Sequence, residues 1–175
     1  NAQASGANAR AIGFNAIAQG PDAVAEGRNV IAIGTGAKAF GYNTNVVSIG
    51  TDGYAEGTNV VALGASARAV GLDTSAFGTQ AIAEGTKALA VGAFSSSYAD
   101  YASAFGPGAT ARAFGSTAIG MNAVTTRPFE VSIGSAYSPY SLPGLHPGGF
   151  IGSRYQKPGE KRFVTTDQTG TLGTT

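Results

Sequence analysis

Glycine recurs at seven-residue intervals through most of the chain, and this spacing restricts the possible folds more than any other feature. The intervals are unbroken over residues 6–41 and, after a two-residue insertion, over residues 50–92. Beyond that point every second glycine of the series remains, at Gly106, Gly120 and Gly134, so the stronger period is fourteen residues. The segments NVIAIGTGAKAFG and NVVALGASARAVG share their paired glycines and their alanines. A fixed period of this kind indicates a stacked repeat architecture.

Three other repetitive structures fit this spacing poorly. A coiled coil has apolar a and d positions and good helix formers, whereas each heptad here would contain a glycine, which costs about 1 kcal/mol relative to alanine. Collagen requires glycine at every third residue, and the chain lacks that period. A disordered Gly/Ala linker would not alternate apolar and small residues so regularly.

The remaining interpretation is an all-β fold, a parallel β-solenoid with coils of fourteen residues. Each seven-residue unit would supply a strand of about five residues and a corner at glycine, where a positive φ or a close backbone approach is tolerated. Two units form one coil, and successive coils stack as parallel strands about 4.8 Å apart. About nine coils would then form a rod on the order of 45 Å tall. Before Gly27 the two strand types are hard to separate, so the arrangement of the first coils is left open.

Side chains alternate between the two faces of a strand, so their position relative to the corner glycine sorts them. In the second strand of each coil one set of positions carries small residues and the other carries charged and aromatic ones. Because unpaired charges are not tolerated inside a narrow roll, the small residues are predicted to point inward. The predicted inward residues are Ala37, Ala39, Gly53, Ala55, Ala67, Ala69, Ala81, Ala83, Ser95, Ser97, Ala109 and Ala111. The predicted outward residues are Lys38, Phe40, Tyr54, Glu56, Arg68, Glu84 and Arg112.

If small residues also point inward in the first strand of each coil, the large apolar residues of that strand point outward. The inward residues would be Ala32, Ser48, Ala62, Ala76, Ala90, Ala104, Ala118 and Ser132. The outward row would cost about 25 cal/mol for each Å² left in water, so we expect other subunits to bury it around a cyclic axis parallel to the rod. The predicted subunit interface consists of Ile31, Ile33, Val47, Ile49, Val61, Leu63, Phe77, Leu89, Val91, Phe105, Ile119, Val131 and Ile133. The alternation alone leaves open a monomer whose large residues fill the roll.

The composition gives little support for catalysis or for binding a charged polymer. The formal net charge is +1, which provides no strong field for nucleic acid, and the absence of cysteine excludes disulfides, thiolate metal sites and a Cys nucleophile. The acidic residues are scattered, and the single histidine, His146 in GLHPGG, is interpreted as a loop residue. We therefore expect no catalytic residue, cofactor or metal. No run of eighteen apolar residues occurs, so no membrane contact is expected from this segment.

The segments NVIAIGTGAKAFG, NVVALGASARAVG and STAIG resemble the repeated S-V-A-I-G pattern in the head domains of trimeric autotransporter adhesins, the Yersinia adhesin A family. The resemblance covers residues 1–134. It implies a left-handed parallel β-roll in an intertwined homotrimer, displayed on a stalk at the outer membrane of a Gram-negative bacterium. It also implies binding to host extracellular-matrix or cell-surface molecules.

The C-terminal part of the chain departs from the repeat. FEVSIGSA, residues 129–136, resembles the last coil entering the neck of that family, and residues 160–175 resemble the charged return of the neck and its exit toward the stalk. Residues 137–159, rich in Pro and Gly, resemble an insertion that the simplest family neck lacks. We therefore expect head repeats over residues 1–134 and a neck-like region over residues 135–175, with the stalk and the membrane anchor outside this chain.

The favoured function is a bacterial surface adhesin head that attaches by polyvalent, non-catalytic contacts. The alternative is a trimeric phage tail fibre or spike, which is also repetitive. A left-handed β-helix acyltransferase is disfavoured, since that fold repeats in hexapeptides and uses a histidine base. An ice-binding surface would need flat Thr ladders, whereas the outward face here carries Lys, Glu, Arg and aromatic residues.

Overall fold

The structure is a computed structural model that describes the whole chain except residues 42–43, 139–163, 167–171 and 175. The chain divides into two compact units, with the division after Ser138. The first unit contains all the glycine repeats and is described almost completely.

In the second unit the described residues form one antiparallel pair, β20 (Val164–Thr166) with β21 (Leu172–Thr174). Most of the predicted insertion, including His146, lies outside the described residues, and so does the larger part of the segment 160–175. The neck-like region and its insertion therefore stay predictions.

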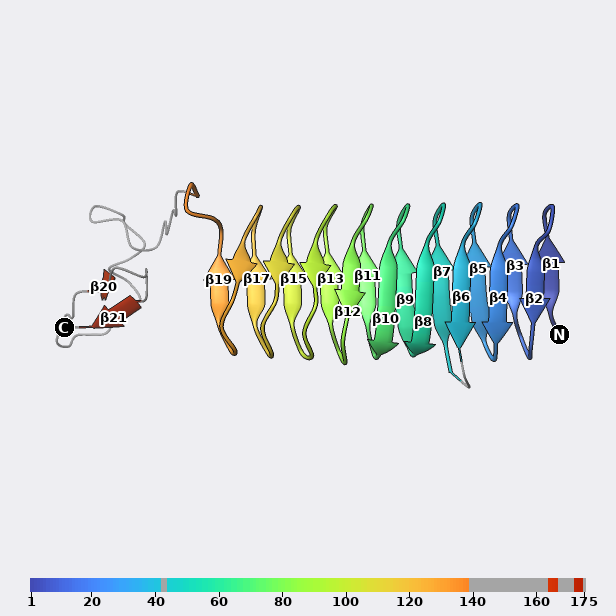
Figure 1. Ribbon diagram of the computed structural model, residues 1–175, viewed down its shortest axis with the longest axis horizontal. Coiled ribbons are helices and arrows are strands. Elements are labelled where there is room, and N and C mark those ends of the chain that lie inside the picture. The colour runs from blue at the N-terminus through green and yellow to red at the C-terminus, as the bar shows by residue number, and fades with distance from the viewer. Residues whose placement is uncertain (42–43, 139–163, 167–171, 175) are drawn as a thin grey trace, which may run out of the picture. The chain divides into compact units, whose positions relative to one another are not determined.

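The strands of the first unit alternate along the chain between two parallel sheets, so each coil contributes one strand to each sheet (Figure 1). The ten-stranded sheet consists of β1 (Gln3–Ser5), β3 (Ile17–Gln19), β5 (Val30–Ile33), β7 (Val46–Ile49), β9 (Val60–Leu63), β11 (Ser75–Phe77), β13 (Leu89–Val91), β15 (Ser103–Phe105), β17 (Thr117–Ile119) and β19 (Val131–Ile133). The nine-stranded sheet consists of β2 (Arg10–Ile12), β4 (Val24–Gly27), β6 (Lys38–Gly41), β8 (Tyr54–Thr58), β10 (Arg68–Leu72), β12 (Ile82–Glu84), β14 (Ser96–Ser97), β16 (Thr110–Ala111) and β18 (Val124–Thr125).

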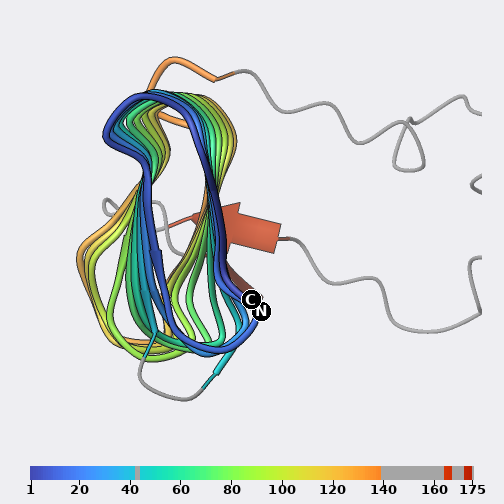
Figure 2. The same ribbon diagram turned by 90° about the vertical axis from the view of Figure 1, so that its right-hand side faces the viewer.

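The pairing register follows the fourteen-residue period. Ala62 pairs with Ala76, for example, and β1 with β3 and β2 with β4 keep the same offset, so the first coils are as regular as the rest. Val30 pairs with Val46, sixteen residues away, because the chain from Gly41 to Val46 is two residues longer than the equivalent chain from Gly57 to Val60. Seen down the stack, the coils of this unit lie over one another (Figure 2). The predicted parallel β-solenoid with coils of about fourteen residues is thereby confirmed.

The interior of the roll is filled almost entirely by alanine. The predicted inward residues of both sheets are buried, except for Ser132, which is half-buried in the last strand of the ten-stranded sheet. The largest fully buried side chains are those of Val30, Val46 and Val60, which begin consecutive strands of that sheet and which the sequence analysis did not single out. The alternative in which large residues fill the roll is therefore excluded.

Stacking of the coils explains why glycine occupies the corners. We call the corner after a strand of the ten-stranded sheet the first corner, and the corner after a strand of the nine-stranded sheet the second corner. At the second corner Gly57 has a φ of 132°, and a Cβ added there would lie 1.9 Å from the carbonyl oxygen of Gly71 in the next coil. An added Cβ at Gly13 would lie equally close to the carbonyl oxygen of Gly27. Glycine is thus required both by the backbone conformation and by the neighbouring coil.

A second residue with positive φ follows two positions after the corner glycine. This residue lies in the left-handed helical region, which Asn and Asp tolerate best among residues with a side chain. Their side chains also bond to the equivalent residue in the next coil: Asn8 Nδ2 donates to Asp22 Oδ1 at 3.0 Å, and Asn59 Nδ2 donates to Asp73 Oδ1 at 2.9 Å. The corners are therefore linked from coil to coil by side chains as well as by the sheets.

The second corner changes in the last three coils. Ala99, Ala113 and Arg127 occupy the glycine position there, and none of them has a positive φ. Hydroxyl groups take part in closing these coils: Ser116 Oγ donates to the carbonyl of Ala113 at 2.7 Å and lies 2.6 Å from Thr125 Oγ1. Buried hydrogen bonds thus support the last corners where glycine is absent.

Replacing Gly57 with alanine is expected to lower the free energy of unfolding by about 3 kcal/mol or more, because the coil must move away from the Gly71 carbonyl. The matched control is Gly115→Ala, since Gly115 also has a positive φ but an added Cβ would meet only the exposed side chain of Phe129. That change is expected to cost about 1–2 kcal/mol. Chemical denaturation followed by circular dichroism measures both, and equal losses would contradict the role given to the coil contact.

Candidate interaction surfaces

The residues predicted to form a subunit interface all project outward from the ten-stranded sheet, and we call them the apolar row. Strand register joins most of them into one unbroken column that runs Ile33, Ile49, Leu63, Phe77, Val91, Phe105, Ile119 and Ile133. A second column beside it contains Ile31, Val47, Val61, Leu89 and Val131, and it is interrupted by Ser75, Ser103 and Thr117. The row therefore follows the sheet from β5 to β19.

No side chain of the apolar row is buried by its own coil. Those in the middle of the sheet are mostly half-buried by their neighbours, whereas Val131 and Ile133 in β19 are 62% and 55% exposed. A continuous apolar stripe of this length is rare on a monomer, which makes the apolar row a candidate interaction surface.

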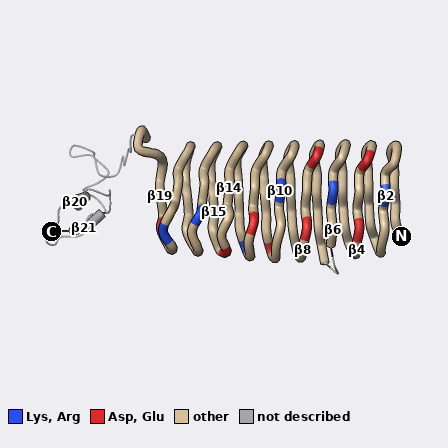
Figure 3. Tube along the Cα trace, viewed as in Figure 1, with Lys and Arg blue, Asp and Glu red and all other residues tan. Residues whose placement is uncertain are grey.

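The outward face of the nine-stranded sheet carries charges whose sign alternates from coil to coil (Figure 3). From β2 to β12 each strand has one charged residue, in the order Arg10, Glu26, Lys38, Glu56, Arg68 and Glu84. Charges of the same sign therefore recur at every second coil, about 9.6 Å apart. This face is the mixed, solvent-exposed face that the sequence predicts.

Several of these side chains contact one another across neighbouring strands. Arg68 pairs with Glu84, and its guanidinium carbon also lies 5.7 Å from the centre of the Tyr54 ring. Because the side chains of Arg68 and Glu84 are 43% and 40% exposed, the pair stabilises the fold by about 1 kcal/mol or less. The contacts thus order the side chains on this surface more than they hold the roll together.

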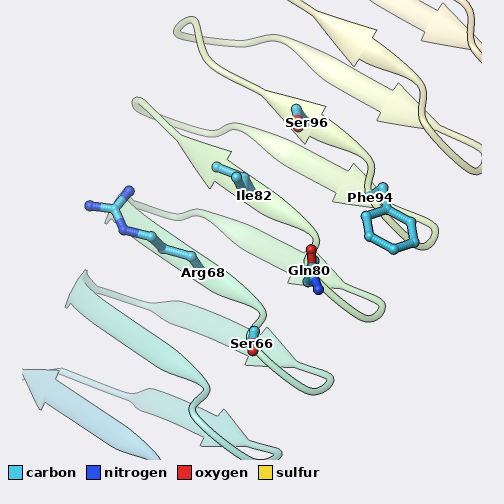
Figure 4. Close-up of a pocket in the computed structure, with 6 residues that line it drawn as sticks. All are labelled: Ser66, Arg68, Gln80, Ile82, Phe94 and Ser96. Carbon is cyan, nitrogen blue, oxygen red and sulfur yellow. The ribbon is translucent and has the colours of Figure 1, made fainter.

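A hollow crosses β10, β12 and β14 beside these contacts (Figure 4). It is lined by Ser66, Arg68, Gln80, Ile82, Phe94 and Ser96. Each of the three coils contributes one residue from its first corner and one from the nine-stranded sheet, and the ring of Phe94 and the guanidinium of Arg68 lie at opposite sides (Figure 4). Hydroxyl, amide and cationic groups beside two apolar side chains suit an extended chain that lies along the stack.

Glu130 closes the second corner of the last coil. Its carboxylate accepts hydrogen bonds from the backbone N–H groups of Thr126 at 2.8 Å and Arg127 at 3.0 Å, and it pairs with the guanidinium of Arg127 at 3.2 Å. The backbone hydrogen bond from Thr126, followed by that from Arg127, holds the pKa of Glu130 below its ordinary value. Glu130 therefore stabilises this corner in its ionised form.

Within the described part of the chain, no group of three or more His, Asp or Glu side chains is arranged to hold a metal ion. No helix in that part is long and apolar enough to cross a membrane. The prominent features are instead long surfaces that repeat with the coil. Such a fold and such faces define a repetitive binding module of the β-solenoid class.

Comparisons with known proteins narrow this class. The family model for the YadA head domain repeat matches residues 11–37, 69–95 and 98–123. Among solved structures, the crystal structure of the collagen-binding domain of Yersinia adhesin YadA matches with 30% sequence identity and a TM-score of 0.63, covering 85% of this chain and 78% of that chain. No curated protein sequence matches. The chain belongs to the YadA head family, whose members are non-catalytic adhesin heads, and this implies a location at the bacterial surface.

The sequence located two of these surfaces correctly. The outward positions of the apolar row and of the charged face are confirmed, as is the resemblance to the adhesin family. The hollow was missed, because its lining combines strand residues with corner residues whose proximity depends on the turn geometry. The left-handed turn could have been predicted, because Asn8, Asn15 and Asp22, residue types that tolerate a positive φ, each follow a glycine by two positions.

Replacing Glu130 with glutamine is expected to lower the unfolding temperature at pH 7. A carboxyl group whose folded pKa is lowered stabilises the fold above its unfolded pKa, so the difference from wild type should shrink as the pH falls from about 4.5 through the lowered value. Thermal unfolding at several pH values measures this. The control is Thr126→Ala, which keeps the N–H donor and should keep the pH dependence. A difference that is independent of pH would contradict the assignment.

Proposed function

We propose that this chain is the head module of a homotrimeric adhesin at the outer membrane of a Gram-negative bacterium. It binds host extracellular matrix through polyvalent, non-catalytic contacts. The observation that carries the proposal is the apolar row, which lies outside a roll whose interior has room only for small side chains. Membership of the YadA head family supports it.

The direction of the apolar row favours cyclic assembly. A row parallel to the stack can be covered along its whole length by equivalent rows on other copies placed around a parallel axis. The intertwined, left-handed trimer implied by the family places three such rows together. Side chains such as Leu63 and Phe77 then pack at the centre, and Val131 and Ile133, which are the most exposed of the row, gain the most from being covered.

An extended matrix chain fits the surface that such a trimer leaves free. The similar solved structure is described as a collagen-binding domain, and we take collagen as the ligand class here. Collagen chains are close to polyproline II, with three residues per turn and a repeat of about 9.3 Å. Like charges on the nine-stranded sheet recur at about 9.6 Å, so a chain lying along the stack meets the same kind of side chain once in each turn.

The hollow gives this ligand a place of close approach. Gln80, Ser66 and Ser96 supply hydrogen-bonding groups there, and Ile82 and Phe94 supply apolar contact. Each single contact is weak, but a trimer presents three copies of the face. A second or third contact on the same fibre is then effectively intramolecular. The overall affinity rises by a factor of about 10²–10⁴ over that of a single contact.

The assembly is tested by the solution mass of the chain and of a Leu63→Glu variant. Light scattering of the wild type is expected to give three times the chain mass of 17.4 kDa. Leu63→Glu should give a single chain mass, because three buried carboxylates near one axis are not tolerated. Val24→Glu, on the nine-stranded sheet, is the control and should stay trimeric. A wild type with the mass of one chain would overturn the assembly.

Collagen binding is tested with Ile82→Glu, which places a charge at the centre of the hollow. Surface plasmon resonance on immobilised fibrillar collagen is expected to show a loss of about tenfold or more in affinity, with the trimer mass unchanged. Val24→Glu, at the equivalent position of a strand outside the hollow, should lose much less affinity than Ile82→Glu. Equal binding by both variants would place the contact elsewhere, and a wild type without saturable binding would refute the ligand class.

A further inference from the structure

A column of exposed aromatic rings lies at the second corner of the last three coils, away from the hollow. Tyr101, Phe114 and Phe129 follow one another from coil to coil, with ring centres 5.4 Å and 5.5 Å apart and interplanar angles of 63° and 83°. Their side chains are 49%, 46% and 74% exposed. Neighbouring rings pack edge to face and all three residues stay partly exposed, so the column offers aromatic surface to a partner.

The backbone at this column is unfavourable for the residues that occupy it. Tyr101 and Phe129 have φ values of 59° and 60°, and bulky residues rarely adopt this left-handed conformation. At the second corner of earlier coils this position carries Asn15, Asn29, Asn59, Asp73 and Lys87, and the side chains of Asn15 and Asn59 donate hydrogen bonds to the next coil. Tyr101 and Phe129 cannot form that hydrogen bond, and their backbone is strained by the left-handed conformation. Keeping aromatic residues there points to a role for the rings themselves.

Neighbouring residues are arranged so that the rings stay accessible. Gly115 occupies the same left-handed position between Tyr101 and Phe129, and a Cβ there would come within 3.0 Å of the Phe129 ring. Glycine therefore leaves space for the ring of Phe129 against the corner. Phe114 fills the gap from the adjacent position and contacts both rings.

Two cationic residues lie close to the column, one in space and one in sequence. Lys87 Nζ lies 5.5 Å from the centre of the Tyr101 ring, and the exposed Arg112 stands two residues before Phe114. Among the described residues neither cation forms an ion pair with a carboxylate. Of the nearby carboxylates, Asp100 accepts a hydrogen bond from the backbone of the preceding coil, and Glu130 is held by its own corner. Since Glu130 is offset by Arg127, the two cations Lys87 and Arg112 against the one carboxylate of Asp100 leave the column with a net positive charge.

We propose that this column is a binding site for an acidic glycan, a chain of sugar rings that carries sulfate or carboxylate groups. The C–H faces of the sugar rings pack on the exposed faces of Tyr101, Phe114 and Phe129, and the anionic groups pair with Lys87 and Arg112. One aromatic ring per coil places successive contacts along a line, which suits a linear polymer. The site is separate from the collagen contact proposed for the nine-stranded sheet and does not depend on it.

The charge argues for this ligand over another copy of the chain. A symmetric contact of the column with the same column of another copy would bring the Lys87 and Arg112 side chains of both copies together, and burying like charges is costly. An acidic glycan supplies the missing anions and leaves the rest of each side chain in water. The complementarity is therefore with a negatively charged polymer.

The test uses the trimeric wild type and immobilised heparin, with uncharged dextran as the reference surface. Phe129→Asn and Tyr101→Asn restore the residue that earlier corners carry, so both variants should fold at least as well as the wild type. Each is expected to weaken heparin binding about tenfold, the effect of losing one good aromatic contact. The matched control is Phe94→Asn, which relieves the same backbone strain at the first corner but removes no ring of the column.

The combined Lys87→Ala, Arg112→Ala variant is expected to weaken binding and to make the remaining affinity less dependent on salt. Binding that falls only in this variant, and not in Phe129→Asn, would reduce the site to general charge attraction and overturn the proposal. Equal losses in Phe129→Asn and Phe94→Asn would also overturn it, as would no saturable binding by the wild type. A change in trimer mass on Phe129→Asn would assign the column to a subunit contact instead.

Discussion

The close stacking of successive coils is the constraint from which the rest of this structure follows. Strands hydrogen-bonded about 4.8 Å apart bring the corners of neighbouring coils into contact, and at Gly57 the next coil leaves no room for a Cβ. Two sheets joined by such short corners lie close together, so the space between them accepts alanine, serine and a few valines. Glycine at the corner and alanine inside are two consequences of one geometry.

An interior made of small side chains cannot supply much hydrophobic stabilisation within one chain, since burial scales with apolar area. Large side chains such as Leu63 and Ile119 are instead placed outside, on the ten-stranded sheet, where their own coil leaves them partly in water. Apolar area that an ordinary domain would bury in its core thus lies at the surface of this roll. In the proposed trimer this area is buried between copies, so folding of the coil and assembly would be coupled.

Much of this was readable from the sequence because a solenoid repeats each structural requirement in every coil. The glycine period predicted the corners, and the alternation between, for example, Ala69 and Arg68 predicted which side faces the interior. What the sequence did not reveal depends on contacts between different positions of the repeat. The hollow joins Gln80 of a corner to Ile82 of a strand, and the left-handed conformation of Phe129 becomes visible only once the turn is built.

Stacking also explains how one small roll can hold several surfaces that change independently. Each position of the repeat forms its own column along the stack, so a substitution affects its neighbours above and below far more than the other columns. The apolar row, the alternating charges and the aromatic rings at the second corner are three surfaces built from such columns. The last differs from the others because Asn, which suits the backbone there, gives way to Tyr101 and Phe129, which do not. In these coils Tyr101 and Phe129 override the local backbone preference, and buried hydroxyls such as that of Ser116 replace the glycine corner. A side chain that is kept at such a strained position serves a contact outside its own coil.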